Sequence, residues 1–178
     1  MSQGFFIELL RKRCSIRKYS TEKISPELIE IIIEAALRSP SARALNPWEF
    51  ILVDDPELIF KLSQAKQNGS EFLKNAPCAI VVCADSSKTD FWIEDTSIAA
   101  IIIQLTASSL GLGSCWVQIR QRQHDPAKAA ETYVQELLEL PEHIQVESIL
   151  GIGHPDETKP TVSVENLQYE KMQYNIWG

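Results

Sequence analysis

The sequence predicts one domain in which helices pack on a single sheet, arranged either as a doubly wound sheet or as an α+β sandwich. The chain has 178 residues, a common length for one domain, and 44% of them are hydrophobic, which is enough for a substantial core. Strand candidates alternate with helix candidates, and no repeat or linker separates them. We therefore expect residues 1–178 to form one domain, with a C-terminal extension from about residue 154.

The N-terminal part predicts two helices separated by a basic loop. Ser2 is a plausible N-cap for a short first helix, which runs into the basic stretch 11–18. Ser25 caps a second helix that has Pro26 at its first position, and Pro40 ends it.

The middle of the chain predicts two strands and the longest helix. A strand over 49–54 precedes a short helix over 56–67, and the strand over 78–84 is apolar on both faces, which places it at the centre of the sheet. The helix over 91–110 is apolar or small nearly all round, so it should be buried.

The last third predicts two further strands around one helix. Strands are expected over 115–120 and 145–152. Between them, Asp125 should cap a helix with Pro126 at its first position. After Gly153 the chain becomes polar and weakly patterned.

Charge and composition exclude several classes of protein. Lys and Arg number 17 against 24 Asp and Glu, a net charge of −7, so no protein-wide basic field exists to bind nucleic acid. The longest apolar runs are too short to cross a membrane, and the N-terminus lacks a signal-peptide pattern. The four cysteines form no Cys-x-x-Cys pair and should be reduced. We expect a cytoplasmic protein with neither nucleic acid nor membrane as a partner.

The basic stretch 11–18 is the strongest local anomaly, because five of its eight residues are Lys or Arg in an acidic chain. Arginine offers a planar fork of donors that suits phosphate, and a neighbouring serine adds a hydroxyl. Arg13-x-Ser15-x-Arg17 could thus bind one phosphorylated ligand. The alternative is a solvated basic turn with no ligand.

Other candidate sites are weaker. Gly111-x-Gly113 follows a helix and precedes a strand, the reverse of a dinucleotide-binding turn, and Gly111 could simply cap the helix. The three histidines show no metal spacing, so no metal is expected. A nucleophilic Cys14 or Cys115 with a distant histidine stays open, without a local signature.

Four segments, in order, resemble the nitroreductase-like flavoproteins, which are small FMN-dependent NAD(P)H oxidoreductases. Arg13 to Tyr19 (RCSIRKY) is similar to the opening Arg-x-Ser-x-Arg motif of that family, and Ser39 to Val53 is similar to its Pro-Ser loop leading through Pro-Trp into a strand. Leu110 to Trp116 resembles its glycine turn, and Leu150 to Pro155 its last core strand and exit turn. The resemblance covers almost the whole chain.

The resemblance implies an α+β nitroreductase-like sandwich, with a mostly antiparallel central sheet of four strands plus a tail strand, flanked by helices. It also implies a homodimer whose C-terminal extension packs on the partner subunit. The cofactor would be FMN, and the enzyme would pass hydride from NAD(P)H through flavin N5 to a nitroaromatic, quinone or similar acceptor, with ping-pong kinetics. No catalytic side chain is needed, because the cofactor carries the chemistry.

The resemblance also assigns cofactor-binding residues. Residues of the first motif would hold the phosphate and ribityl end of FMN, with Arg17 near the N1/O2 edge of the ring. The Pro-Ser loop would approach the cofactor from the other subunit. The backbone of the glycine turn would approach the N5/O4 edge of the ring. The residues concerned are Arg13, Cys14, Ser15, Arg17, Pro40, Ser41, Ala42, Arg43, Leu112, Gly113 and Ser114, with Lys159 and Lys171 as candidates for the cation that closes over the phosphate.

The sequence departs from the family pattern at two points and leaves other readings open. The C-terminal Lys or Arg that closes over the phosphate in the family has no obvious counterpart, since the tail after Gly153 offers only Lys159 and Lys171. Ala44 stands where the family often has Asn, and Asn46 comes two residues later. Phe91 and Trp92 could form a lid over a ring substrate or simply pack in the core. The alternative functions are a specialised flavin reaction, such as reductive dehalogenation or substrate dehydrogenation, and flavin binding without turnover.

Overall fold

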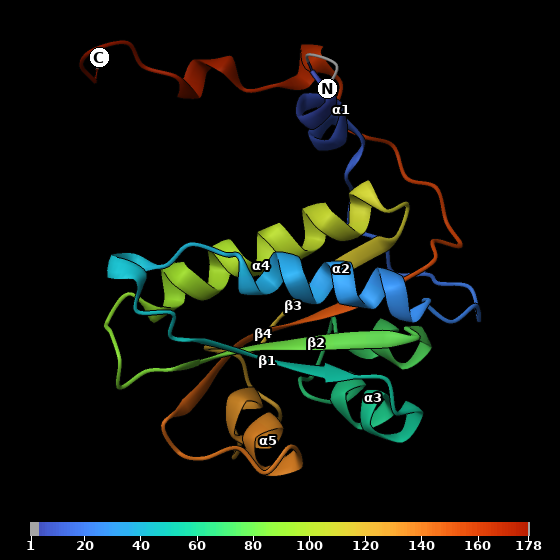
Figure 1. The fold of residues 1–178 in the computed structure, drawn as a ribbon, viewed down its shortest axis with the longest axis vertical. Coiled ribbons are helices and arrows are strands. Elements are labelled where there is room, and N and C mark those ends of the chain that lie inside the picture. Colours follow the sequence, from blue (N-terminus) through green and yellow to red (C-terminus); the bar gives the residue numbers. More distant parts are fainter. Residues whose placement is uncertain (1–3, 178) are drawn as a thin grey trace.

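The computed structural model describes residues 4–177 and shows one four-stranded sheet between two helical layers (Figure 1). The strands lie in the order β1-β2-β4-β3, and every neighbouring pair is antiparallel. This confirms the α+β sandwich and excludes the doubly wound sheet. The strands are β1 (Trp48–Val53), β2 (Cys78–Asp85), β3 (Gly113–Gln118) and β4 (Ile144–Gly153).

The helices cover the two faces of the sheet in pairs. Helices α2 (Pro26–Leu37) and α4 (Trp92–Ser109) lie on one face, and α3 (Pro56–Ser63) and α5 (Ala130–Leu137) lie on the other (Figure 1). Each pair encloses a separate hydrophobic cluster, because side chains of a strand alternate between the faces. The first helix, α1 (Phe5–Lys12), lies beyond these layers, beside the C-terminal segment (Figure 1).

The central position of β2 follows from its composition, as predicted. Every residue from Cys78 to Ala84 is buried, and β2 has neighbours on both edges. The register of β2 against β4 shifts between Val82 and Cys83, which leaves Glu147 of β4 as a bulge residue. All four cysteines are free thiols, as expected.

The starts of α2 and α3 were predicted correctly, and the start of α5 was wrong. The Ser25 hydroxyl accepts a hydrogen bond from the Leu28 amide at the start of α2. Asp125, however, does not cap α5: its carboxylate accepts hydrogen bonds from the amides of Ala127 and Lys128, which closes a tight turn instead. The helix begins only at Ala130. The proposed N-cap Ser2 lies outside the described residues.

The expected burial of α4 is met on only one side of the helix. Its inner face is buried, but Ile98 and Ile101 are each about two-fifths exposed. Among residues 154–177, no tail strand joins the sheet either. From β4 to residue 177, the helical elements are two short 3-10 turns, Val164–Asn166 and Tyr169–Lys171, and the large apolar side chains of this segment are exposed. Within residues 4–177, no helix is long and apolar enough to cross a membrane.

Candidate functional site

The basic segment, residues 13–18, is extended backbone joined to the outer edge of β3. Ser15 pairs with Ser114 in a parallel bridge, and the Ile16 amide donates to the Ser114 carbonyl at 3.0 Å. On its other side the segment runs beside the chain that leaves β4, where the Asp156 amide donates to the Lys18 carbonyl at 2.9 Å. The predicted basic loop is therefore a helix end, Arg11 and Lys12, followed by an edge segment held on both sides.

Tyr19 anchors the end of this segment in the core. Its buried hydroxyl lies 2.6 Å from the Ile16 carbonyl and 3.0 Å from the Gly151 carbonyl, between which it shares its one proton. Burial raises the pKa of the Tyr19 phenol far above its ordinary value, so the neutral donor is kept. At Gly153, a Cβ would lie 2.6 Å from the Pro77 ring and 2.9 Å from the Tyr19 ring. This close packing explains why Gly153, the second glycine of the exit turn, cannot carry a side chain without a clash.

The basic segment borders a surface pocket of about 360 Å³ near the C-terminal end of α4. Arg13 and Cys14 line it together with all three predicted residues of the glycine turn, Leu112, Gly113 and Ser114, and with Lys159. Lys159 donates from Nζ to the Ser15 carbonyl at 2.8 Å. The fold thus brings two predicted segments and one predicted lysine together.

Glu157 is a member of this cluster that sequence reasoning missed. One carboxylate oxygen accepts hydrogen bonds from the backbone amides of Arg17 (2.5 Å) and Lys18 (3.2 Å), and it lies 3.0 Å from Lys159 Nζ. The Arg17 amide is the main cause that lowers the pKa of Glu157. Glu157 therefore fixes both the basic segment and Lys159.

The Arg17 side chain lies on a different part of the cluster. Its guanidinium carbon is 5.9 Å from the centre of the Phe72 ring, and it does not line the pocket. Burial raises the pKa of the nearby Cys115 thiol, while Arg17 and Lys159 act in the opposite direction. A buried thiol with a raised pKa is a poor nucleophile, which argues against catalysis by Cys115.

Two further cations that the sequence did not indicate extend this basic edge. Burial lowers the pKa of Lys66, and the charge of the nearby Arg122 lowers it further, while the charge of Glu71 acts in the opposite direction. Within residues 4–177, no carboxylate lies within 4.0 Å of the charged groups of Arg13, Arg17, Lys66 or Arg122. Lys66 lies in a loop with no motif around it, so only the fold could reveal it.

The two glycines of the glycine turn have separate structural roles. Gly111 has a positive φ of 78°, and the following Leu112 amide donates back to the Ala107 carbonyl, so Gly111 ends α4 as predicted. At Gly113, a Cβ would lie 2.8 Å from the Ile16 side chain. Gly113 therefore lets the basic segment approach β3, a packing role that the sequence did not reveal.

The Pro-Ser loop lies at the opposite end of α4 from the pocket. The Ala42 amide donates to Asp95, in the first turn of the helix, whereas Ser108, in its last turn, lines the pocket. At 1.5 Å per residue these two helix positions are about 20 Å apart. Within one chain, Pro40, Ser41, Ala42 and Arg43 are thus not brought to the predicted residues of the basic segment.

The remaining candidates are dispersed. Lys171 lies in the exposed 3-10 turn of the tail and does not line the pocket. Trp92 is half-buried, and the guanidinium carbon of Arg120 lies 5.8 Å from the centre of the Trp92 ring. Phe91 is exposed. The hypothesis that these two residues form a lid stays a prediction. Among the described residues, no group of His, Cys, Asp and Glu could hold a metal ion.

Comparison with known proteins identifies the family. The model of the Nitroreductase family matches residues 10–69 and 58–154. A protein of Archaeoglobus fulgidus with the provisional name NADH dehydrogenase/NAD(P)H nitroreductase is 41% identical, over 86% of this chain and 87% of its own length. The FMN reductase [NAD(P)H] of Bacillus subtilis is 30% identical, over 95% of this chain and 74% of its own.

A solved structure agrees with these sequence matches. The structure of an FMN-dependent nitroreductase from Clostridium difficile superposes with a TM-score of 0.95 and 48% identity, covering 96% of this chain and 99% of that one. The resemblance seen in the sequence is confirmed in both sequence and fold.

Proposed function

This chain belongs to the nitroreductase family, and from that premise we propose that it is an FMN-dependent oxidoreductase. It takes hydride from NADH or NADPH and passes it to a nitroaromatic, a quinone or a similar electron-poor acceptor. The names of its relatives support FMN as cofactor and NAD(P)H as donor. The observation that carries the proposal is the group of unpaired cations along the outer edge of β3.

The residues at this edge fit the chemistry of FMN. FMN has a dianionic phosphate, a polar ribityl chain and a ring that becomes more negative when it accepts electrons. In a chain of net charge −7, the cations Arg13, Arg17, Lys66 and Arg122 lie at one edge without a carboxylate partner among residues 4–177. Clustered positive charge of this kind is expected where an anion binds.

Each part of the edge has a proposed role. Arg13, Ser15 and Lys159 hold the phosphate and ribityl end, and the backbone from Leu112 to Ser114 borders the ring. Arg17 supplies positive charge at the N1/O2 edge of the ring, where a fixed cation stabilises developing negative charge. Lys66 and Arg122 add to this positive potential.

FMN, when bound, supplies the ring that accepts and donates hydride. The protein supplies position and charge. Glu157 holds the Arg17 backbone and Lys159 in place, and Tyr19 holds the end of the segment on the core. This scheme requires no acid or base side chain. We also propose that nicotinamide and acceptor occupy the same stacking position in turn, which gives ping-pong kinetics.

We propose that the working unit is a homodimer. The Pro-Ser loop and the basic segment lie about 20 Å apart along α4, so a loop that contacts the cofactor must come from a second copy. Apolar residues also stay exposed on α4 and α1, including Ile98, Ile101 and Phe5. Large apolar surfaces of this kind are typical of obligate interfaces.

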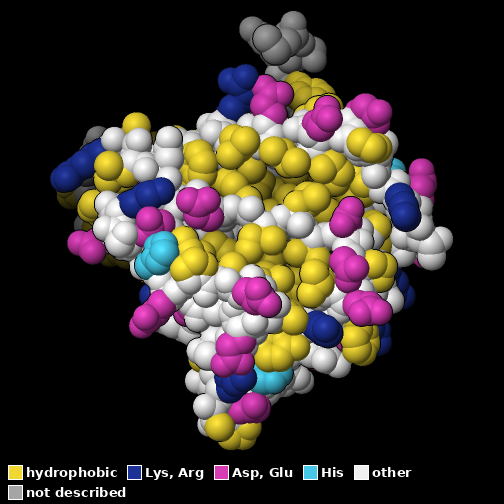
Figure 2. Space-filling model, turned by 60° about the horizontal axis from the view of Figure 1, so that its bottom comes forward, with side chains coloured by type: hydrophobic (Ala, Val, Ile, Leu, Met, Phe, Trp, Pro, Cys, Tyr) yellow, Lys and Arg dark blue, Asp and Glu magenta, His cyan; other side chains and the backbone are white. Residues whose placement is uncertain are grey.

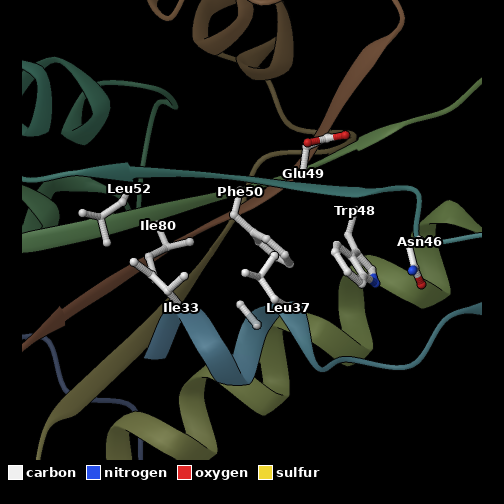
Figure 3. A pocket seen from close by; sticks show the side chains of 9 residues that line it. Ile33, Leu37, Asn46, Trp48, Glu49, Phe50, Leu52 and Ile80 are labelled. Carbon is white, nitrogen blue, oxygen red and sulfur yellow. The ribbon is translucent and has the colours of Figure 1, made fainter. Parts of the chain in front are cut away.

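The C-terminal extension of one copy fits a groove on the other. Apolar side chains of α2 and β1 face one another across a groove of about 340 Å³, lined by Ile33, Leu37, Phe50 and Leu52 among others (Figure 3). Figure 2 shows hydrophobic side chains gathered over a broad area of one face. The extension carries a matching set of apolar residues with no cover of their own; Trp177 is 89% exposed. β1 is an edge strand, which can accept a further segment.

Two broader statements belong to the same proposal. The chain acts as one FMN-binding domain over residues 1–178, with its extension from about residue 154. It works in the cytoplasm, which agrees with four free cysteines, because cytosolic thiols are kept reduced.

The test begins with the absorbance spectrum of the purified protein, which should show bound flavin that is released as FMN on denaturation. Initial rates are then measured against NADH or NADPH at several fixed concentrations of a quinone or a nitroaromatic. Parallel double-reciprocal lines support the shared stacking position, whereas intersecting lines exclude it. FMN binding without NAD(P)H oxidation would favour the specialised or the non-catalytic alternative.

A further inference from the structure

The loop of residues 41–46 has an unfavourable backbone conformation. Arg43, Ala44 and Asn46 have φ values of 53°, 55° and 47°, in the left-handed region that favours glycine. Three such residues among six persist only where the surroundings impose them, and such strain is concentrated at functional sites. The loop also exposes the Arg43 side chain, which has no carboxylate within 4.0 Å in the described part of the chain.

One hydrogen bond connects this loop to the core. Ser41 and Asn46 bond to each other, since the Asn46 amide donates to Ser41 Oγ at 2.9 Å and that hydroxyl donates to Asn46 Oδ1 at 2.7 Å. These bonds stay inside the loop. The Ala42 amide donates to Asp95 Oδ1 at 2.8 Å, and in residues 4–177 this is the one hydrogen bond that leaves the loop.

Asp95 is unusual in being a carboxylate held in the interior. It is 3% exposed, and its Oδ2 atom has no hydrogen-bond partner among the described residues. The buried Nε1 of Trp48 also lacks a partner, and the Trp48 ring is turned toward α4 (Figure 3). Burying a carboxylate is costly, so a site that keeps one needs a compensating interaction. The first turn of α4 and the Ala42 amide supply it.

We infer that Asp95 is a positioning residue that holds the 41–46 loop in its strained conformation and thereby presents Arg43 to the FMN of the partner subunit. The inference rests on the proposed function, in which this loop approaches that cofactor. It goes beyond that proposal because it assigns a role to the buried Asp95 carboxylate. This group lies away from the cofactor site of its own chain, yet it controls cofactor binding in the other subunit.

The first test measures the loop itself by hydrogen exchange of backbone amides in the purified protein. Asp95→Ala removes the acceptor of Ala42, so exchange at residues 42–46 should become about ten- to a hundredfold faster, the range expected for loss of a charged hydrogen bond. Asp95→Asn keeps an oxygen acceptor and should restore slow exchange. Glu94→Ala is the matched control, since it removes an exposed acid from the same helical turn. Unchanged exchange in Asp95→Ala would overturn the inference.

The second test measures the dissociation constant of FMN in a double-mutant cycle. Arg43→Ala and Asp95→Ala should each weaken FMN binding by about tenfold, and the double variant should be hardly weaker than either one, because both changes remove the same contact. Fully additive effects would show that Asp95 acts without Arg43 and would overturn the inference. If Asp95 only stabilised the fold, its effect on FMN binding would add to the effect of Arg43→Ala.

The two proposals fail in different ways. If Arg43→Ala binds FMN like the wild type, the loop does not contact the cofactor, and the placement of the loop falls together with this inference. If Arg43→Ala weakens binding but Asp95→Ala does not, the loop placement stands and the role of Asp95 is wrong. If Asp95→Ala does not fold, Asp95→Leu fills a similar volume without an acceptor and gives the same readings.

Discussion

The basic segment 13–18 and the loop 41–46 are both expected at the cofactor, yet they are held in opposite ways. The basic segment is bonded to β3 on one side and to the exit of β4 on the other, and the buried Tyr19 anchors its end. The loop has a strained backbone and, within the described part of the chain, one hydrogen bond to the core, from Ala42 to Asp95.

The difference suggests a division of labour within the proposed dimer. The part that binds the phosphate is built into the sheet of its own chain, so it should keep its shape in an isolated subunit. The part that completes the site from outside depends on a single buried carboxylate and should respond to changes in the interface. Variants that loosen one region should therefore leave the other largely unchanged.

The largest effect is expected from a glycine on which the anchored region depends. In Gly153→Ala, the new Cβ would lie 2.6 Å from the Pro77 ring and 2.9 Å from the Tyr19 ring, neither of which can yield easily. We expect the free energy of unfolding to fall by about 3 kcal/mol, the upper end of the usual cost of overpacking, because two rings lie in the way. Urea denaturation measures it.

A variant at a second glycine distinguishes the effect of this clash from the effect of backbone strain alone. Gly111 has a positive φ but no atom within 4 Å of its Cβ position. Gly111→Ala should therefore cost only about 1 kcal/mol, from conformation alone. Equal losses in the two variants would show that the close approach to Tyr19 is unimportant.

The next effect concerns cofactor affinity. Arg13→Ala removes a charged partner of the proposed phosphate contact, which should cost about 1.5 to 3 kcal/mol, or one to two decades in the dissociation constant of FMN. Arg11→Ala is the control, because Arg11 belongs to the same basic stretch but pairs with Glu8 on the surface. If Arg13→Ala retained FMN as tightly as the wild type, the assignment of Arg13 to the phosphate would be wrong.

The sequence predicted the fold well where a local pattern decides the structure. The apolar run of β2 predicted a central strand, and Ser25 with Pro26 predicted the start of α2. Asp125 misled because an aspartate before a proline favours a turn as well as a helix cap, and the two bonds to its carboxylate closed the turn.

The candidate site was predictable only in part, because half of it depends on tertiary contacts. Arg13 and the glycine turn carry motifs, and the structure brings them to one pocket. Glu157 and Lys66 carry no motif, and their roles come from neighbours far away in the sequence. The packing role of Gly113 against Ile16 was likewise hidden until the two segments were placed side by side.

A smaller effect is expected on the redox properties of the site. Arg17 places its charge beside the proposed ring edge, so Arg17→Ala should lower the reduction potential of bound FMN. A tenfold loss of preference for the reduced form corresponds to about 30 mV for a two-electron couple. Arg17→Lys keeps the charge and should restore most of the potential, as measured by reductive titration. An unchanged potential in Arg17→Ala would remove Arg17 from the ring edge and leave it as a surface partner of Phe72.

The smallest effect concerns the anchor itself and its dependence on pH. Tyr19→Phe removes one shared hydrogen-bond donor and should lower the free energy of unfolding by about 1 kcal/mol near neutral pH. Burial raises the pKa of Tyr19 in the folded state, so folding favours the protonated phenol. The unfolded chain loses this proton near pH 10, its ordinary pKa, while the folded protein keeps it.

The contribution of Tyr19 should therefore be complete below pH 10 and decline as the pH rises further. Buried thiols with raised pKa values, such as Cys78 and Cys83, act in the same direction, so the informative quantity is the difference between wild type and Tyr19→Phe. Unfolding measured between pH 8 and pH 11 should show that difference shrinking at the alkaline end. A constant difference would mean that Tyr19 titrates alike in both states and that its hydroxyl is not the buried anchor of the basic segment.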